Sequence, residues 1–170
     1  MYSETERLFR PKLVRALIDR LAPHTAGDFH DNQTVLGRWR ETVLSNQPGE
    51  SQLESAFAQQ ILGKILGYQG VGEGGRLDYR FKENTGTGRI PDITMGKEIL
   101  GKGWQPCAIL ELKSPNLLFH KVLSNGKTPI EQAWDYANIL GNIEWVLLTN
   151  FRTIRLYSYR HGQKYAEDFD

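Results

Sequence analysis

The chain has 170 residues, of which 39% are hydrophobic and 24% charged, and this length and composition fit one globular domain with one core. Its 21 basic and 20 acidic residues leave a formal net charge of +1, which excludes a polycation that binds nucleic acid or membranes by charge alone. The single cysteine, Cys107, excludes an internal disulfide, and its apolar neighbours predict a buried thiol in a reducing compartment.

The chain carries no apolar run near the ~20 residues that a membrane helix needs. Its first residues are too polar and acidic for a signal peptide. We therefore expect a soluble, cytoplasmic protein. Residues 164–170 turn polar without a closing element, so we also expect a domain cut from a longer polypeptide.

Three helices are predicted in the first part of the chain. A capping-box pattern at residues 3–6 and apolar residues at helical spacing predict a helix over 11–22 that stops before Pro23. A weaker apolar pattern over 35–44 predicts a second helix. The third opens at residues 49–51, has one apolar stripe and ends at Gly67.

After Gly67 the pattern changes to short alternating segments separated by glycine-rich turns. Strands are predicted at 77–81, 89–95, 108–113, 144–149 and 153–159, and a helix at 130–140. This order predicts one α/β domain over 1–170 with a mixed central sheet flanked by helices. Residues 1–48 form a helical extension and residues 49–160 the core.

Two charged residues interrupt the apolar segment 107–113. Side chains alternate along a strand, so Glu111 and Lys113 project from the same face, while Ala108, Leu110 and Leu112 pack on the other. Burial of such charges requires a partner, a metal ion or water. An ordinary Glu–Lys pair on a solvent-facing edge strand is the structural alternative.

Asp92 follows Pro91 at the start of another predicted strand. If Asp92 pairs into the neighbourhood of Glu111, two hard carboxylate ligands converge and suit Mg²⁺. Lys113 beside them would orient a water or neutralise charge on a phosphate. These three parts are the ones that phosphodiester hydrolysis needs.

Pro91-Asp92 and Glu111-Leu112-Lys113 resemble the signature of the PD-(D/E)xK nuclease superfamily, and the similarity runs from about residue 50 to 159. Four segments resemble, in order, the nuclease domains of type I restriction motor subunits and of fused restriction-modification polypeptides: residues 109–115, 132–137, 145–150 and 154–157. This resemblance implies a restriction-endonuclease-like core.

The resemblance further implies Asp92 and Glu111 as metal ligands, Lys113 as the catalytic lysine, and Gln132 with Tyr136 as a glutamine-x-x-x-tyrosine element on one helix face. Family members often add a glutamate from the helix before the sheet. Glu54 is preferred over Glu50 for this third ligand, although Ser51 to Glu54 equally forms a capping box.

The implied function is a Mg²⁺-dependent DNA endonuclease of a restriction-modification system, with Mn²⁺ as a substitute and double-stranded DNA as substrate. Translocase, methyltransferase and specificity domains or subunits are expected partners. Six cations near the site are candidate DNA contacts: Arg76, Arg80, Lys82, Arg89, Lys121 and Lys127. A catalytically silent binding or scaffold module and a repair nuclease of the same fold remain as alternatives.

Overall fold

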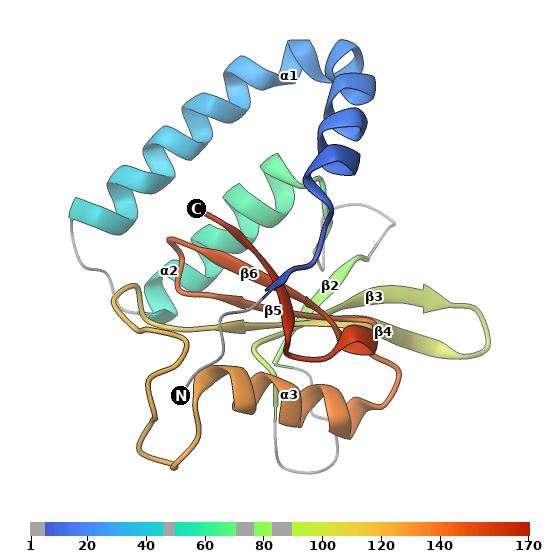
Figure 1. The fold of residues 1–170 in the computed structure, drawn as a ribbon, viewed down its shortest axis with the longest axis vertical. Coiled ribbons are helices and arrows are strands. Elements are labelled where there is room, and N and C mark those ends of the chain that lie inside the picture. Colours follow the sequence, from blue (N-terminus) through green and yellow to red (C-terminus); the bar gives the residue numbers. More distant parts are fainter. Residues whose placement is uncertain (1–5, 46–49, 71–76, 83–89) are drawn as a thin grey trace.

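The computed structural model describes residues 6–45, 50–70, 77–82 and 90–170, with the side chains of 18–30 and Ser45 left out. Seven strands form one mixed sheet in the order β1-β7-β6-β5-β4-β3-β2. Helices lie on both of its faces (Figure 1). The predicted mixed α/β class is therefore confirmed.

Most neighbouring strands are antiparallel, and only β4 with β5 and β1 with β7 are parallel. The parallel step from β4 to β5 is made through helix α3, as a crossover connection requires. The strands are β1 (Glu6–Arg7), β2 (Tyr79–Phe81), β3 (Ile93–Ile99), β4 (Gly103–Leu112), β5 (Trp145–Thr149), β6 (Ile154–Ser158) and β7 (Tyr165–Phe169).

The helices are α1 (Pro11–Ser45), α2 (Glu50–Phe57), α3 (Pro129–Leu140), the π-helical turn η1 (Ala58–Ile65) that continues α2, and the 3₁₀ turn η2 (Tyr159–His161). The predicted end of the first helix before Pro23 is wrong, because α1 continues to Ser45 and includes the second predicted helix. Figure 1 shows α1 as two arms that meet at an angle, since a proline inside a helix can bend it without ending it.

The sheet separates two apolar clusters. One lies under α1 and α2 and is centred on Trp39, Phe57 and Phe151, whose rings are 5.7 to 6.2 Å apart. The other lies under α3 and includes Ile109 and Ala133. Helix α3 begins with a capping box at Thr128 and ends at Gly141, which has a left-handed φ of 79°.

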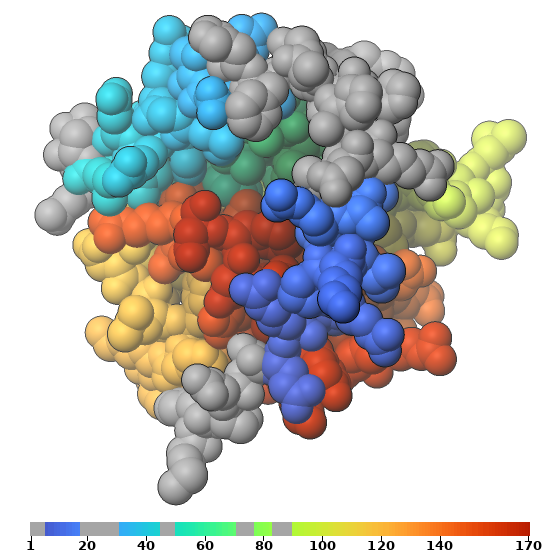
Figure 2. All heavy atoms as spheres, turned by 45° about the horizontal axis from the view of Figure 1, so that its top comes forward, coloured from blue at the N-terminus to red at the C-terminus, as the bar shows by residue number. Residues whose placement is uncertain are grey.

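The face under α1 also contains a cavity of about 1470 Å³, bounded by Trp39, Ile65 and Leu147 among other residues. The β3–β4 hairpin stands out from the body of the molecule in Figure 2, and Leu100 at its tip is fully exposed. Among the helices of the described residues, none combines the length and apolar character that crossing a membrane requires.

Two further expectations are corrected. Residues 164–170 do contain a closing element, because β7 pairs with both β6 and β1. Cys107 is exposed and not buried. Met95 pairs with Ala108 and Gly96 with Pro106, so the register shift leaves Cys107 as the extra residue of a β-bulge, without a partner in β3.

Candidate metal and catalytic site

The register of β3 against β4 brings Asp92 and Glu111 together. Ile93 pairs with Leu110, so the next position places Asp92 opposite Glu111 on the same face of the sheet. The backbone N–H of Leu112 donates a hydrogen bond to Asp92 Oδ2 at 2.8 Å. This bond fixes the Asp92 carboxylate at the end of the β3–β4 ladder, beside Glu111.

Glu111 near the end of β4 and Lys113 just after it project to the same side, as the alternation predicts. Leu110 and Leu112 belong to the apolar cluster under α1 and α2, whereas Ile109 belongs to the cluster under α3. Glu111 is 2% exposed, and Lys113 Nζ donates to its Oε1 at 2.6 Å. The alternative of a solvent-facing Glu–Lys pair is excluded by this burial.

Burial changes the proton affinity of both carboxylates. Desolvation, with the nearby charge of Asp92, raises the pKa of Glu111 to about 7. Desolvation also raises the pKa of Asp92, although the hydrogen bond from the Leu112 N–H lowers it in part. For Lys113, burial lowers the pKa, but the adjacent Glu111 outweighs it, so the pKa of the ammonium is raised.

The second oxygen of Glu111 is left without a partner. Its Oε2 is buried and makes no hydrogen bond, which is costly for a carboxylate of this burial. In the part of the chain that the structure describes, no three His, Cys, Asp or Glu side chains converge on a metal position. Two carboxylates are nevertheless sufficient for Mg²⁺, which keeps several of its waters, so Asp92 and Glu111 fit this ion.

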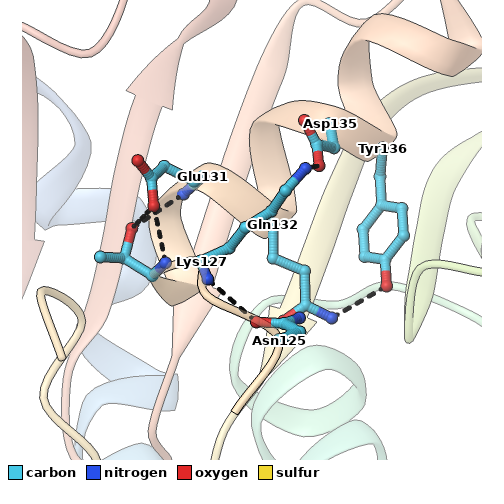
Figure 3. A network of polar contacts seen from close by, with 7 residues as sticks. Asn125, Lys127, Glu131, Gln132, Asp135 and Tyr136 are labelled. Carbon is cyan, nitrogen blue, oxygen red and sulfur yellow. Dashed lines mark hydrogen bonds and ion pairs between the residues drawn. The ribbon is translucent and has the colours of Figure 1, made fainter. Parts of the chain in front are cut away.

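Helix α3 presents Gln132 and Tyr136 near these carboxylates. Gln132 Nε2 donates to the Tyr136 hydroxyl at 3.0 Å, one helical turn further along (Figure 3). Burial raises the pKa of Tyr136, and the charges of Glu111 and Asp92 add to the rise. Tyr136 is therefore within electrostatic reach of Glu111, and Gln132 is joined to the site through Tyr136.

Two glutamates of α2 lie at the same end of the sheet. Glu54 Oε2 accepts a hydrogen bond from Lys82 Nζ at 3.0 Å, and its charge raises the pKa of Asp92. Glu50 Oε2 accepts one from Ser114 Oγ at 3.4 Å. The structure thus places Glu54 beside Asp92 but in an ion pair, and its assignment as a third metal ligand stays a prediction.

Three of the candidate DNA contacts are engaged by acidic side chains. Arg80 pairs with Glu98 at 2.7 Å, Lys82 with Glu54, and Lys127 with Asp135, the last pair being drawn in Figure 3. Lys121 is exposed on the loop before α3. The two remaining candidates, Arg76 and Arg89, lie outside the described residues.

Sequence reasoning did not identify Lys82 as part of the site itself. Lys82 follows β2 with a φ of 42°, a left-handed value that is rare for a residue other than glycine, and its N–H donates to the Asp92 carbonyl at 2.9 Å. The ion pair with Glu54 spans 28 positions of the chain, so no local pattern predicts it.

Comparison of the chain with family models, with curated proteins and with solved structures finds no match in any of the three. The case for a function therefore depends on the residues of the site and on the chemistry that they can perform.

Proposed function

We propose that this chain is a Mg²⁺-dependent DNA endonuclease domain of a restriction-modification system, built on a restriction-endonuclease-like core. Its substrate is double-stranded DNA, and attached translocase, methyltransferase and specificity domains or subunits direct it. The resemblance of Pro91-Asp92 and Glu111-Leu112-Lys113 to the signature of PD-(D/E)xK nucleases indicates this activity. The geometry of the same residues supports it.

One observation carries the proposal: Asp92 and Glu111 lie opposite each other, and Glu111 keeps one buried oxygen without a partner. If Glu111 served only as an ion-pair partner of Lys113, its Oε1, which already accepts from the ammonium, would be sufficient. A second carboxylate beside it raises the electrostatic cost of burial through repulsion between like charges. A cation on Asp92 and Glu111 would remove that cost, and this is the arrangement that a metal-dependent nuclease requires.

Each residue has a defined part in the proposed reaction. Mg²⁺ bound by Asp92 and Glu111 would supply Lewis-acid activation of the phosphate and of a water. Lys113, an ammonium held by Glu111, neutralises negative charge that develops on the phosphate and positions the attacking water. Tyr136 keeps its hydroxyl proton for donation, because that oxygen already accepts from Gln132, and the pair orients groups at the site.

Cleavage of supercoiled plasmid tests the activity. The polypeptide that contains this chain, with Mg²⁺ present, is expected to nick or linearise the plasmid, and Glu111→Ala is expected to abolish this. Lys113→Ala should slow single-turnover cleavage by about 100-fold or more, because loss of one electrostatic stabiliser typically costs that much. Plasmid left intact by the unmodified protein would turn the interpretation towards a catalytically silent DNA-binding module.

Calorimetric titration with Mn²⁺ tests the ligands separately from activity. Asp92→Ala and Glu111→Ala should each weaken Mn²⁺ binding by at least about tenfold. Substitution of residues that only support the ligands of a metal site already lowers metal affinity by about 10–100-fold. Lys113→Ala should retain binding, because an ammonium does not ligate a cation. Glu98→Ala is the matched control, since Glu98 is a carboxylate of β3, the strand that Asp92 immediately precedes, and pairs with Arg80. Unchanged affinity in both ligand variants would refute the assignment.

A further inference from the structure

Six charged side chains interact electrostatically around the point where β3 begins and β4 ends. Lys82 and Lys113 each act electrostatically on several of the carboxylates, and the carboxylates on one another. We call this group the carboxylate–lysine cluster: Glu50, Glu54, Lys82, Asp92, Glu111 and Lys113. With all six ionised, four negative and two positive charges leave it with a formal charge of −2. One divalent cation balances this charge, and two would exceed it.

The two lysines occupy different places in the cluster. Lys113 is inside, with 11% of its side chain exposed, and pairs with Glu111. Lys82 lies at the rim, with 57% of its side chain exposed, and pairs with Glu54, of which 14% is exposed. Each ammonium is therefore the partner of one glutamate, and the charge of Asp92 interacts with members of both pairs.

The backbone holds Lys82 at this place. Its N–H donates to the carbonyl oxygen of Asp92 at 2.9 Å, which joins the end of β2 to the start of β3. The φ of 42° turns the chain there, and this left-handed conformation is strained and rare for a lysine. Because this strained residue is the one whose ammonium reaches Glu54, its placement is specific and differs from that of an ordinary surface lysine.

A glutamate beside Asp92 is also where a second metal ion would find a ligand. Carboxylates shared between two ions 3.5–4 Å apart are the usual basis of two-metal sites in nucleases. Here Glu54 Oε2 is already bound to a cation of the protein, the ammonium of Lys82. The ammonium of a lysine supplies a positive charge that does not have to be bound from solution. It lacks the Lewis acidity of a metal ion.

We propose that the ammonium of Lys82 takes the place of a second divalent cation beside Glu54, so that this chain binds one metal ion, on Asp92 and Glu111, and not two. The inference rests on the proposed function, since it concerns the same metal site. It assigns Lys82 a charge-balancing role in place of the DNA contact that the sequence predicts. It also makes Glu54 the partner of this ammonium and not a metal ligand.

The number of Mn²⁺ ions bound without DNA tests the inference, measured by calorimetry and by electron paramagnetic resonance of free and bound Mn²⁺. The unmodified chain should bind one ion. Lys82→Gly and Lys82→Met should bind two, with the second weaker. Lys82→Gly is the safer variant, because glycine adopts a positive φ without strain. Lys82→Arg keeps the charge and should bind one ion.

The double variant Lys82→Gly with Glu54→Gln should return to one ion, which shows that the added ion depends on Glu54. One ion in both Lys82→Gly and Lys82→Met would overturn the inference while leaving the site on Asp92 and Glu111 intact. Two ions in the unmodified chain would overturn it as well. If Mn²⁺ binding does not depend on Asp92 or on Glu111, the proposed function is overturned together with the inference.

Discussion

His120, in the connection between β4 and α3, makes a hydrogen bond with Arg155 of strand β6. Arg155 Nη1 lies 3.1 Å from His120 Nε2, and the same guanidinium donates twice to Asp168 at 2.6 Å. A neutral imidazole accepts this hydrogen bond, whereas an imidazolium would face another cation. Burial and the charge of Arg155, only partly offset by Asp168, accordingly lower the pKa of His120 below its ordinary 6.5.

This lowered pKa predicts a loss of stability in acid. Below about pH 6.5 the unfolded chain binds a proton at His120 that the folded chain does not, so the free energy of unfolding should fall as the pH falls towards the folded pKa. His120→Gln should show a smaller fall. Urea denaturation of both proteins between about pH 8 and about pH 5.5 measures the difference. Parallel curves would mean that another group causes the acid sensitivity.

Among the site residues, those whose positions follow from local periodicity are the ones that the sequence could predict. Period-two alternation is enough to put Glu111 and Lys113 on one face, because the neighbouring Leu110 and Leu112 belong to the other face. Gln132 and Tyr136 follow equally from helical spacing. The pairing of Lys82 with Glu54 depends on how α2 packs over the end of β2, and that packing has no signature in either segment alone.

Gly96 is a point where the structure of an element depends on one missing side chain. The β3–β4 register shifts between Met95 and Gly96, and a Cβ at Gly96 would lie 2.2 Å from the Gln105 carbonyl oxygen. The Gly96 N–H donates to the Asp78 carbonyl at 2.9 Å. The bulge thus permits a close approach of three backbone segments, upstream of the strand end that holds Glu111.

Gly96→Ala should therefore lower the free energy of unfolding by about 1–3 kcal/mol, the usual cost of forcing atoms into filled space. Gly37→Ala is the control, because the space around Gly37 in α1 is open to 4 Å. That substitution should raise stability by about 0.5–1 kcal/mol, since alanine is the better helix residue. Chemical denaturation compares the two. Equal stability of Gly96→Ala and the unmodified chain would exclude the tight bulge.

Local patterns predict the elements that bury an apolar face and miss those formed by long-range pairing. Strands β2, β5 and β6 and helix α3 lie close to their predicted ranges. Strand β3 begins four residues later than predicted, and β4 begins five residues earlier, because the two strands pair along the whole β3–β4 hairpin. Strand β7 buries only Ala166, too little for a local apolar pattern, and it forms by pairing with the edge of β6. Strand β1 pairs in turn with β7 over two residues. In α1, Pro23 gives a strong local stop signal, but packing of Trp39 and Val43 on the core favours one continuous helix.

At the scale of the whole molecule, the two faces of the sheet have different chemistry. The face under α1 carries an apolar cavity, and Leu110 of β4 lines it. Glu111, next in the chain, belongs to the opposite face with Ile109, beneath α3. Asp92 and Glu111 thus lie on the face beneath α3, at the strand end that Glu54 of α2 also reaches, and the net charge of +1 says little about the local field there.

Affinity for DNA depends on how many cations along the surface neutralise phosphates, because each neutralised phosphate releases counterions. In the described part of the chain, Arg80, Lys82 and Lys127 are held in ion pairs with Glu98, Glu54 and Asp135. A phosphate can recruit such a cation only by competing with its carboxylate, and the carboxylates of the site repel the DNA backbone further.

We therefore predict that the isolated chain binds duplex DNA with a dissociation constant of ~10⁻⁴ to 10⁻⁶ M, the range of non-specific contacts, and that affinity falls steeply with salt. Fluorescence anisotropy with several unrelated duplexes at two salt concentrations measures this. Lys121→Ala removes an exposed cation of the loop before α3 and should weaken binding equally for all duplexes, because a phosphate contact carries no sequence information. Nanomolar binding to one sequence, insensitive to salt, would show that the chain itself recognises DNA and does not depend on attached domains for specificity.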